Sequence, residues 1–350
     1  MKQTERDRRG RAFVGISRFA DFTRTEEANG DVVLTSPELP TDLAADEIIV
    51  SWNADAPPGT GLKVEARAFG GDHATKFYTL GLWSRDGETY PRESVNGQKD
   101  ADGDVETDTL VLTQPASRVQ MRVTLHRAAP GALPTLKFLG LSLTDSRARP
   151  EPLEPNRAVW GKEIAVPSRS QLAYKGGGGW CSPTSTAMTL AFWAKSLDRP
   201  ELDIPVPEAA HAIFDRVWKG TGNWPFNTAF AGSFPGLRAY VTRLSDVREL
   251  EDWIAAGIPP IVSVSYDLLR GTQRDHDPGH LLVCDGFTAE GDIVLNDPAH
   301  HPDRGEVARR VFPRANFIRA WQRSKDTVYL IYPEGAKLPP DPCGHWESRP

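Results

Sequence analysis

The chain has 350 residues, of which 39% are hydrophobic and 25% are charged, and this composition is typical of a globular protein with more than one domain. Its formal net charge of −6 argues against a general nucleic-acid-binding surface. No apolar run is long enough for a membrane span, and no export segment follows the charged amino terminus. We therefore expect a cytoplasmic protein, with secretion as the alternative.

The amino-terminal half has the pattern of a β domain. Residues 1–28 are expected to form a flexible segment, and residues 146–160, with three prolines after position 149, are expected to form a linker. Between them lie short alternating runs separated by Gly, Pro and Asp turns, at residues 32–34, 47–52, 62–68, 77–82, 108–112, 117–125 and 135–143. This pattern predicts an antiparallel β-sandwich over residues 29–145.

Aromatic residues of the predicted sandwich could form a ligand surface. Trp52, Trp83 and Tyr90 are candidates for stacking on a carbohydrate or a peptide. A purely structural role for this domain is an equal alternative, because a fold does not determine a function.

The stretch from Trp180 to Ser185 carries the first candidate for chemistry. Cys181 lies between four glycines, residues 176–179, and a segment that is expected to begin a helix. Backbone N–H groups and the helix dipole at such a position favour the thiolate, which is the nucleophilic form of cysteine. The glycines, and Gly179 with Trp180 in particular, would let a substrate approach this thiol.

Helices are predicted first and strands later in the carboxy-terminal half. Helical spacing occurs at residues 185–195, 207–219, 234–244 and 247–256, and strand patterns occur at 260–266, 279–287, 292–299 and 327–332. Residues 218–228 are expected to be a loop, in which Trp224 either contacts substrate or pins the loop to the surface. The order predicts an α+β domain over residues 161–335, followed by a tail over 336–350.

Two of the predicted strands carry a candidate base and acid. His280 opens one strand and Asp297 ends the next, and a turn at residues 291–292 joins them, so the two side chains should be neighbours in an antiparallel pair. His276 is the alternative base and Asp285 the alternative acid. However, Asp285 lies five residues along the strand from His280, about 16 Å away if the strand is fully extended.

The order of cysteine, histidine and carboxylate resembles that of papain-like cysteine peptidases. Residues 165–332 are more similar to one branch, the C39-like peptidases related to bacteriocin-processing enzymes. The resemblance implies a papain-like fold with Cys181 as nucleophile, His280 as general base and Asp297 as the acid that orients it. It also implies an oxyanion-hole role for Gln171, although the spacing from Gln171 to Cys181 is longer than usual in papain-like enzymes.

These roles would produce a thiol-dependent hydrolase that cleaves peptide bonds through a thioester. The same intermediate could pass its acyl group to an amine, as in a transpeptidase or acyltransferase. A non-catalytic peptide-binding or carbohydrate-binding protein is the remaining alternative. A peptide or protein is the expected partner, and His276 would lie at the rim of the substrate site.

The other cysteines and histidines do not predict a cofactor or metal. Cys284 follows an apolar run and is expected to pack in the core, whereas Cys343 is expected to be a solvent-exposed thiol in the tail. His276 and His280 have a spacing that would suit zinc on a helix, but Pro278 and Gly279 argue against a helix there.

Overall fold

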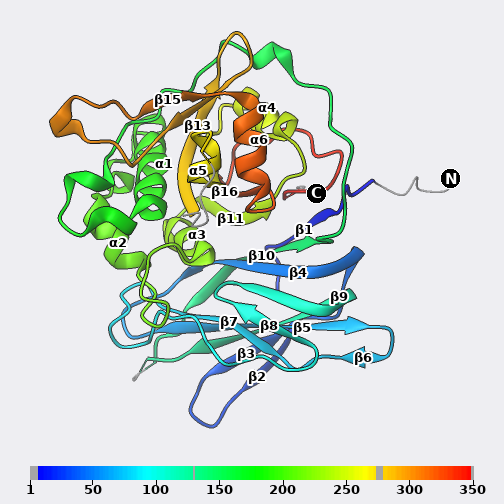
Figure 1. Cartoon of the computed structure of the whole chain (residues 1–350). Coiled ribbons are helices and arrows are strands. Elements are labelled where there is room, and N and C mark those ends of the chain that lie inside the picture. The colour runs from blue at the N-terminus through cyan, green and yellow to red at the C-terminus, as the bar shows by residue number, and fades with distance from the viewer. Residues whose placement is uncertain (1–6, 129–130, 273–278, 348–350) are drawn as a thin grey trace.

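In the computed structural model, which describes residues 7–128, 131–272 and 279–347, two bodies stack on one another. The amino-terminal half forms an antiparallel β domain, and the carboxy-terminal half forms a second domain of helices around an antiparallel sheet (Figure 1). This architecture is the α+β fold that the sequence predicts.

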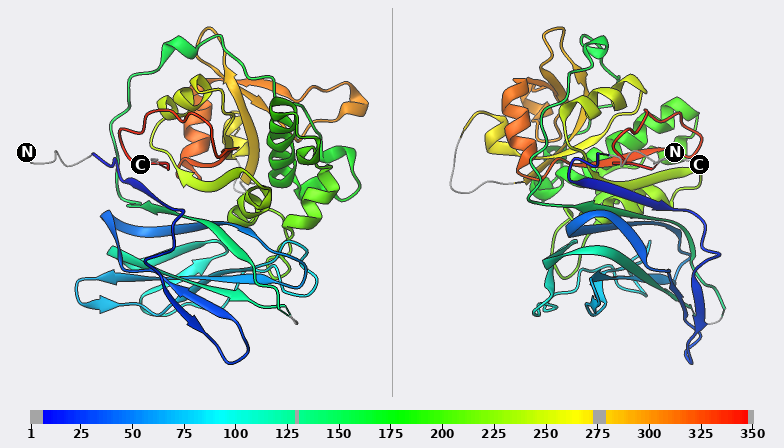
Figure 2. Two further views of the ribbon diagram at one scale, coloured as in Figure 1. Left: turned by 180° about the vertical axis from the view of Figure 1, so that it is seen from behind. Right: turned by 90° about the vertical axis from the view of Figure 1, so that its right-hand side faces the viewer.

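The amino-terminal domain is one hydrogen-bonded antiparallel sheet. Its strands are β1 (Arg11–Ile16), β2 (Thr23–Glu26), β3 (Val32–Thr35), β4 (Leu39–Asp55), β5 (Gly61–Gly70), β6 (His73–Ala74), β7 (Tyr78–Trp83), β8 (Gly103–Glu106), β9 (Thr109–His126) and β10 (Thr135–Thr144). β4 pairs with β9 between Leu39 and Ile49 and with β10 between Glu47 and Asp55, so the two pairings overlap only over residues 47–49. Because the two ends of the long strand β4 pair with different strands, the sheet folds over into two layers (Figures 1 and 2).

Two features of this domain correct the sequence analysis. Residues 11–26, which fall in the segment expected to be flexible, contain β1 and β2, and β1 pairs along its whole length with β10 because Ala12 and Phe13 are buried there. Trp52 and Trp83 are completely buried, so they form core and not an exposed stacking surface.

The second domain places helices on both sides of a six-stranded sheet. Its helices are α1 (Cys181–Leu197), α2 (Val206–Ile213), α3 (Trp224–Ser233), α4 (Val247–Ala255), α5 (Tyr266–Leu269) and α6 (Arg314–Gln322). Its strands are β11 (Leu237–Arg243), β12 (Ile261–Ser265), β13 (Gly279–Phe287), β14 (Ile293–Asn296), β15 (Arg309–Phe312) and β16 (Thr327–Pro333), in the spatial order β11-β16-β12-β13-β14-β15.

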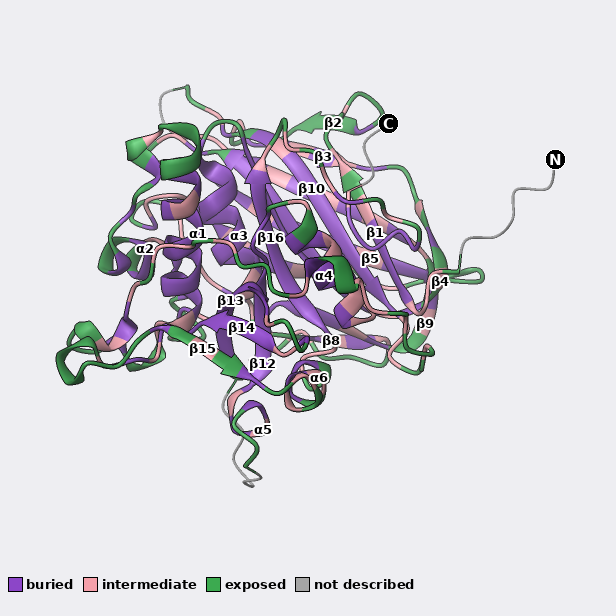
Figure 3. Ribbon diagram, turned by 90° about the horizontal axis from the view of Figure 1, so that it is seen from above, coloured by how far each residue is buried: buried purple, intermediate pink, exposed green. Residues whose placement is uncertain are grey.

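Short 3₁₀ helices complete the domain, at Arg157–Val159, Gln171–Ala173, Gly177–Gly179, Pro200–Leu202 and Pro302–Arg304. The strands of the sheet are buried almost throughout, apart from the partly exposed edge strand β15, as seen from above in Figure 3. Within the described residues, none of the helices combines the length and the apolar character that a bilayer crossing requires.

Two predicted elements of this domain are wrong. Residues 234–244, which have helical spacing, form strand β11, because Pro235 and Gly236 end α3 and both faces of the following segment are buried. Residues 218–228, expected as a loop, contain the start of α3. The signal for that helix was present in Asn223 as N-cap, whose side chain accepts from the Phe226 N–H, and in Pro225 in the first turn.

The carboxy-terminal tail packs onto the rest of the molecule. Trp346 is 1% exposed and lies edge-on to Trp253, with ring centroids 5.5 Å apart. Cys343 is buried as well, which corrects the expectation of an exposed thiol. The backbone N–H of Phe13 donates to Gly344 O at 2.8 Å, so both ends of the chain meet at the same place.

Side chains of the first domain form hydrogen bonds with the backbone of β11, the edge strand of the second sheet. Asn53 on β4 donates through Nδ2 to Ala239 O at 2.6 Å and accepts from the Ala239 N–H at 3.1 Å. The Val241 N–H donates to Ser51 Oγ at 2.8 Å. Unpaired edge groups would otherwise require water or another strand, so β4 completes the hydrogen bonding of β11 and joins the two domains.

We predict that Asn53→Ala lowers the free energy of unfolding by about 2 to 4 kcal/mol, since it leaves a buried donor and a buried acceptor of Ala239 without partners. Denaturant titration of both variants would measure this against Asn96→Ala, which changes an exposed asparagine of the same domain. Equal stabilities of the two variants would contradict the sealing role.

Candidate active site

Cys181 is the first residue of α1, where the sequence places it. The preceding 3₁₀ turn of glycines brings the chain to this helix, and Gly177 is required there because a Cβ would lie 1.9 Å from Gln171 O. The thiol is half-buried, and the N–H of Ser182 is hydrogen-bonded to it. The nucleophile candidate therefore lies at a helix N-terminus with a backbone donor to its sulfur.

The hairpin of β13 and β14 brings His280 and Asp297 together. Asp297 follows the last residue of β14, and His280 is the second residue of β13. His280 Nε2 lies 2.8 Å from Asp297 Oδ1, and both side chains are buried. Because Nε2 is engaged by the carboxylate, Nδ1 is the ring nitrogen that remains for Cys181.

Further donors converge on the Asp297 carboxylate. Tyr266 donates its hydroxyl to Oδ2 at 2.7 Å, and the Ala299 N–H donates to Oδ1 at 2.8 Å. Arg310 Nε lies 3.4 Å from Oδ2. Burial alone would raise the pKa of Asp297, but the His280 hydrogen bond and charge and these donors lower it to about 2.

The sequence analysis did not find Tyr266 or Arg310. Tyr266 begins the short helix α5, and its ring packs against that of His280 at a tilt of 44°, with centroids 4.2 Å apart. Arg310 is on β15, which pairs with β14. Neither residue is part of a local pattern, and only the sheet pairing brings them to the acid.

The thiol and the imidazole change each other's protonation. Burial would raise the pKa of Cys181, but the hydrogen bond and positive charge of His280, with the Leu281 and Ser182 N–H groups, lower it overall. Burial would lower the pKa of His280, but its hydrogen bonds to Asp297 and Cys181 raise it to about 9. Both shifts favour a thiolate beside an imidazolium over a neutral thiol beside a neutral ring.

Gln171 lies in the 3₁₀ turn that precedes the glycines and is 3% exposed. Its backbone N–H donates to Pro298 O at 3.0 Å, which ties this segment to the loop of Asp297. Its Nε2 donates to Gly178 O at 2.9 Å and has a second proton available. The long spacing to Cys181 is taken up by the two short 3₁₀ turns, and Gln171 still borders the same cavity as the thiol.

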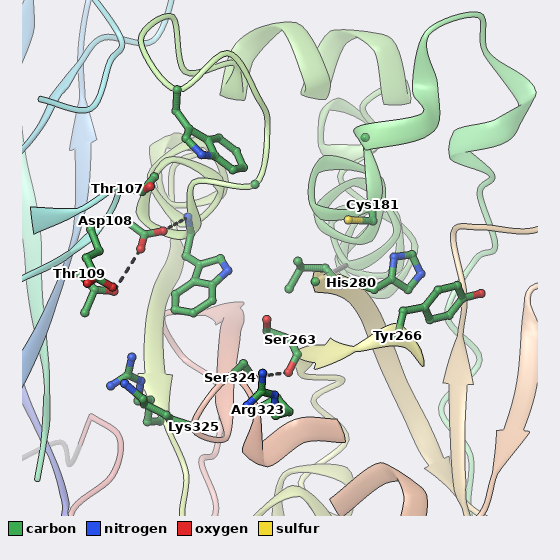
Figure 4. A pocket seen from close by; sticks show the side chains of 18 of the residues that line it. Thr107, Asp108, Thr109, Cys181, Ser263, Tyr266, His280, Arg323, Ser324 and Lys325 are labelled. Atoms are coloured by element: carbon green, nitrogen blue, oxygen red, sulfur yellow. Dashed lines mark hydrogen bonds between the residues drawn. The ribbon is translucent and has the colours of Figure 1, made fainter. Parts of the chain in front are cut away.

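The cavity in front of Cys181 has a volume of about 860 Å³ and walls from both domains. Gln171, Gly179 and Trp224 border it from the second domain, and Trp218, which is 47% exposed, borders it as well. Residues 106–109 border it from the first domain. Figure 4 shows Thr107, Asp108 and Thr109 on the opposite side from Cys181 and His280.

Two other predicted substrate residues have different positions. Trp180 is half-buried and packs beside Tyr174, with ring centroids 6.3 Å apart, and it is absent from the described lining of the cavity. His276, predicted at the rim, lies outside the described residues.

Two family models match the chain. Residues 163–329 match the model of the Peptidase_C39 like family, and residues 14–144 match that of the peptidase C39 N-terminal domain. The carboxy-terminal domain belongs to the peptidase C39-like family. A search of curated proteins gave no match.

Similar solved structures include a protein described as a C39-like peptidase from Bacillus anthracis, with 16% identity, a TM-score of 0.38, and coverage of 50% of this chain and 99% of the other. A structure of infectious bursal disease virus, Gt strain, has 13% identity and a TM-score of 0.22 over 40% of this chain and 33% of the other. The CBM22-1 and GH10 modules of Clostridium thermocellum xylanase 10B have 9% identity and a TM-score of 0.18 over 45% and 31%. Likenesses this low carry no argument about substrate.

The alternative acid and the other thiols of the C39-like chain are unsuited to the site. Asp285 is buried without a partner for its Oδ1 among the described residues, and burial raises its pKa to about 8. Burial also raises the pKa of Cys284, and it raises that of Cys343 to about 11. These two thiols are therefore protonated near neutral pH, and their pKa shifts run opposite to that of Cys181.

One group of side chains has the composition of a metal site. Ligand atoms of Glu249, Cys343 and His345 lie within 4.8 Å of one another. However, His345 Nδ1 is 2.7 Å from Glu249 Oε1, and its Nε2 is 2.8 Å from Arg8 O. Both ring nitrogens therefore already have partners within the protein. These contacts connect the tail to α4.

We predict that iodoacetamide labels Cys181 rapidly at pH 6.5 and that His280→Ala slows this labelling at least about tenfold. Without the imidazolium, burial raises the thiol pKa, and each unit of pKa removes about nine-tenths of the thiolate at a pH below it. Raising the pH to 9.5 should recover part of the rate.

His211→Ala, which changes an exposed histidine, is the matched control. Mass spectrometry would locate the label and give its rate. The thiolate–imidazolium assignment would be wrong if the two variants labelled alike, or if the label appeared first on Cys343.

Proposed function

We propose that the chain is a cysteine peptidase that hydrolyses peptide bonds with Cys181, His280 and Asp297. The observation that carries the proposal is that His280 is fixed between the buried Asp297 carboxylate and Cys181, which begins a helix in a cavity open to substrate. A histidine with a purely structural role would not require a thiol at its second ring nitrogen, whereas a general base for a cysteine nucleophile does.

In the proposed acylation step, Cys181 Sγ attacks the peptide carbonyl carbon and the carbonyl oxygen becomes an oxyanion. The Gln171 amide and the backbone N–H of Cys181 at the start of α1 would stabilise that charge. The imidazolium of His280 gives its proton to the leaving amine as the C–N bond breaks. The amino-terminal part of the substrate is now a thioester on Cys181, and the carboxy-terminal part leaves with a free amino group.

In the deacylation step, neutral His280 removes a proton from water, which attacks the thioester carbonyl carbon. The C–S bond breaks, and the carboxylic acid product leaves the thiolate and the imidazolium as they began. Asp297 keeps the ring oriented throughout, and Tyr266 and Ala299 hold the carboxylate. No redox agent or cofactor takes part in this cycle.

Digestion of a mixed peptide library, with new termini read by mass spectrometry, tests the proposal. The parent should produce new termini, whereas Cys181→Ala should produce none. New amides in the presence of an added amine, without free acids, would indicate the acyltransferase. Binding of peptides without cleavage by a protein whose Cys181 labels slowly would indicate the non-catalytic binding protein.

We predict that Gln171→Ala lowers kcat on a cleaved peptide by about 10²-fold with a smaller effect on KM, because the lost donor acts on the oxyanion of the transition state. Steady-state kinetics against Gln114→Ala, an exposed glutamine on β9, would measure the effect. An unchanged kcat would remove Gln171 from the oxyanion hole.

A further inference from the structure

The turn between β8 and β9 has an unusual conformation. Glu106 pairs with Thr109, so Thr107 and Asp108 form the tip of the hairpin. The Asp108 N–H donates to Glu106 O at 2.7 Å, and Thr107 between them has φ +61°. This is a γ-turn with a β-branched residue in the left-handed region, a combination that costs energy and persists only when surrounding contacts impose it.

Contacts with the C39-like domain impose this conformation. Asp108 is buried, and its Oδ2 accepts from the Trp224 N–H, the first residue of α3, at 2.8 Å. Its Oδ1 accepts from the Thr109 hydroxyl at 3.1 Å. Figure 4 shows both bonds. The tip of an amino-terminal hairpin is thus fixed to the helix that borders the cavity.

One carboxylate of this turn, that of Glu106, borders the cavity without a partner among the described residues. Three carboxylates border the cavity from the first domain. Glu47 is held by Arg243 and Lys325, and Asp108 is held as described above. Glu106 is exposed, and its carboxylate has no hydrogen-bond or ion-pair partner among the described residues.

We propose that the β8–β9 turn is a specificity wall of the peptidase site, in which Glu106 selects peptides with a lysine or arginine side chain. The inference rests on the proposed peptidase function and assigns to the amino-terminal domain the choice of substrate. A basic side chain that reaches across the cavity would meet a carboxylate that has no ion-pair partner among the described residues, although Arg243, Arg323 and Lys325 also border the cavity. The γ-turn and Asp108 hold the backbone beside this carboxylate in place.

Glu106→Gln and Glu106→Lys test the wall, with Glu27→Lys as a control for the same charge change on an exposed part of the same domain. The probes are two peptide sets that differ only by lysine or glutamate at one position at a time around the cleaved bond. Glu106→Gln should lower kcat/KM for the lysine peptide by about fivefold, mainly through KM. Glu106→Lys should lower it further and favour the glutamate peptide.

Two further measurements separate this inference from the proposed function. The iodoacetamide rate of Cys181 should be the same in parent and Glu106 variants, because the wall does not activate the thiol. Peptide binding to Cys181→Ala, with and without Glu106→Lys, should show the same change in preference without any chemistry.

An equal effect of Glu106→Lys on both peptides, or none, in turnover and in binding, would overturn the specificity wall. A change in binding preference by a protein that neither labels rapidly nor cleaves would support the wall and overturn the peptidase.

Discussion

The joint between β4 and the edge of the second sheet is the constraint on which the functional arrangement depends. Asn53 and Ser51 satisfy backbone groups of β11 that an isolated sheet would leave unpaired. Apolar residues of both domains form one continuous buried cluster around this joint. Because the domains are fixed to each other, a hairpin of the first domain can be a permanent wall of the cavity in the second.

Burial and neighbouring charges shift the pKa values of the site residues in opposite directions. Burial by itself would protonate Cys181 and Asp297 and deprotonate His280. Hydrogen bonds and charges among the three residues reverse each of these pKa shifts. Tyr266 and the Ala299 N–H also donate hydrogen bonds to the Asp297 carboxylate. The three groups therefore titrate as a unit. Asp285 is buried on β13, the strand of His280, and has no positively charged group paired with it among the described residues. Its pKa is raised, whereas that of Asp297 is lowered.

Local patterns were sufficient for much of this arrangement. Glycines before Cys181 and a turn between two apolar strands were enough to predict that Cys181 lies at a helix start and that His280 lies beside Asp297. Such features can be predicted from sequence because they depend on residues that are close together in the chain. Residues 234–244 show the limit, since their helical spacing is also compatible with a strand buried on both faces, and only the cover supplied by the first domain decides between the two.

By itself, the sequence determined two β-rich regions, a cysteine poised at a helix N-terminus and the order of its partners, because propensity, turn residues and short-range pairing act within a few residues. Only the tertiary structure decided that Tyr266 and Arg310 support Asp297, that Cys343 and Trp346 are buried, and that Glu106 and Thr107 border the same cavity as Cys181. These contacts join segments tens to hundreds of residues apart, and their partners are chosen by strand pairing and domain packing rather than by local pattern.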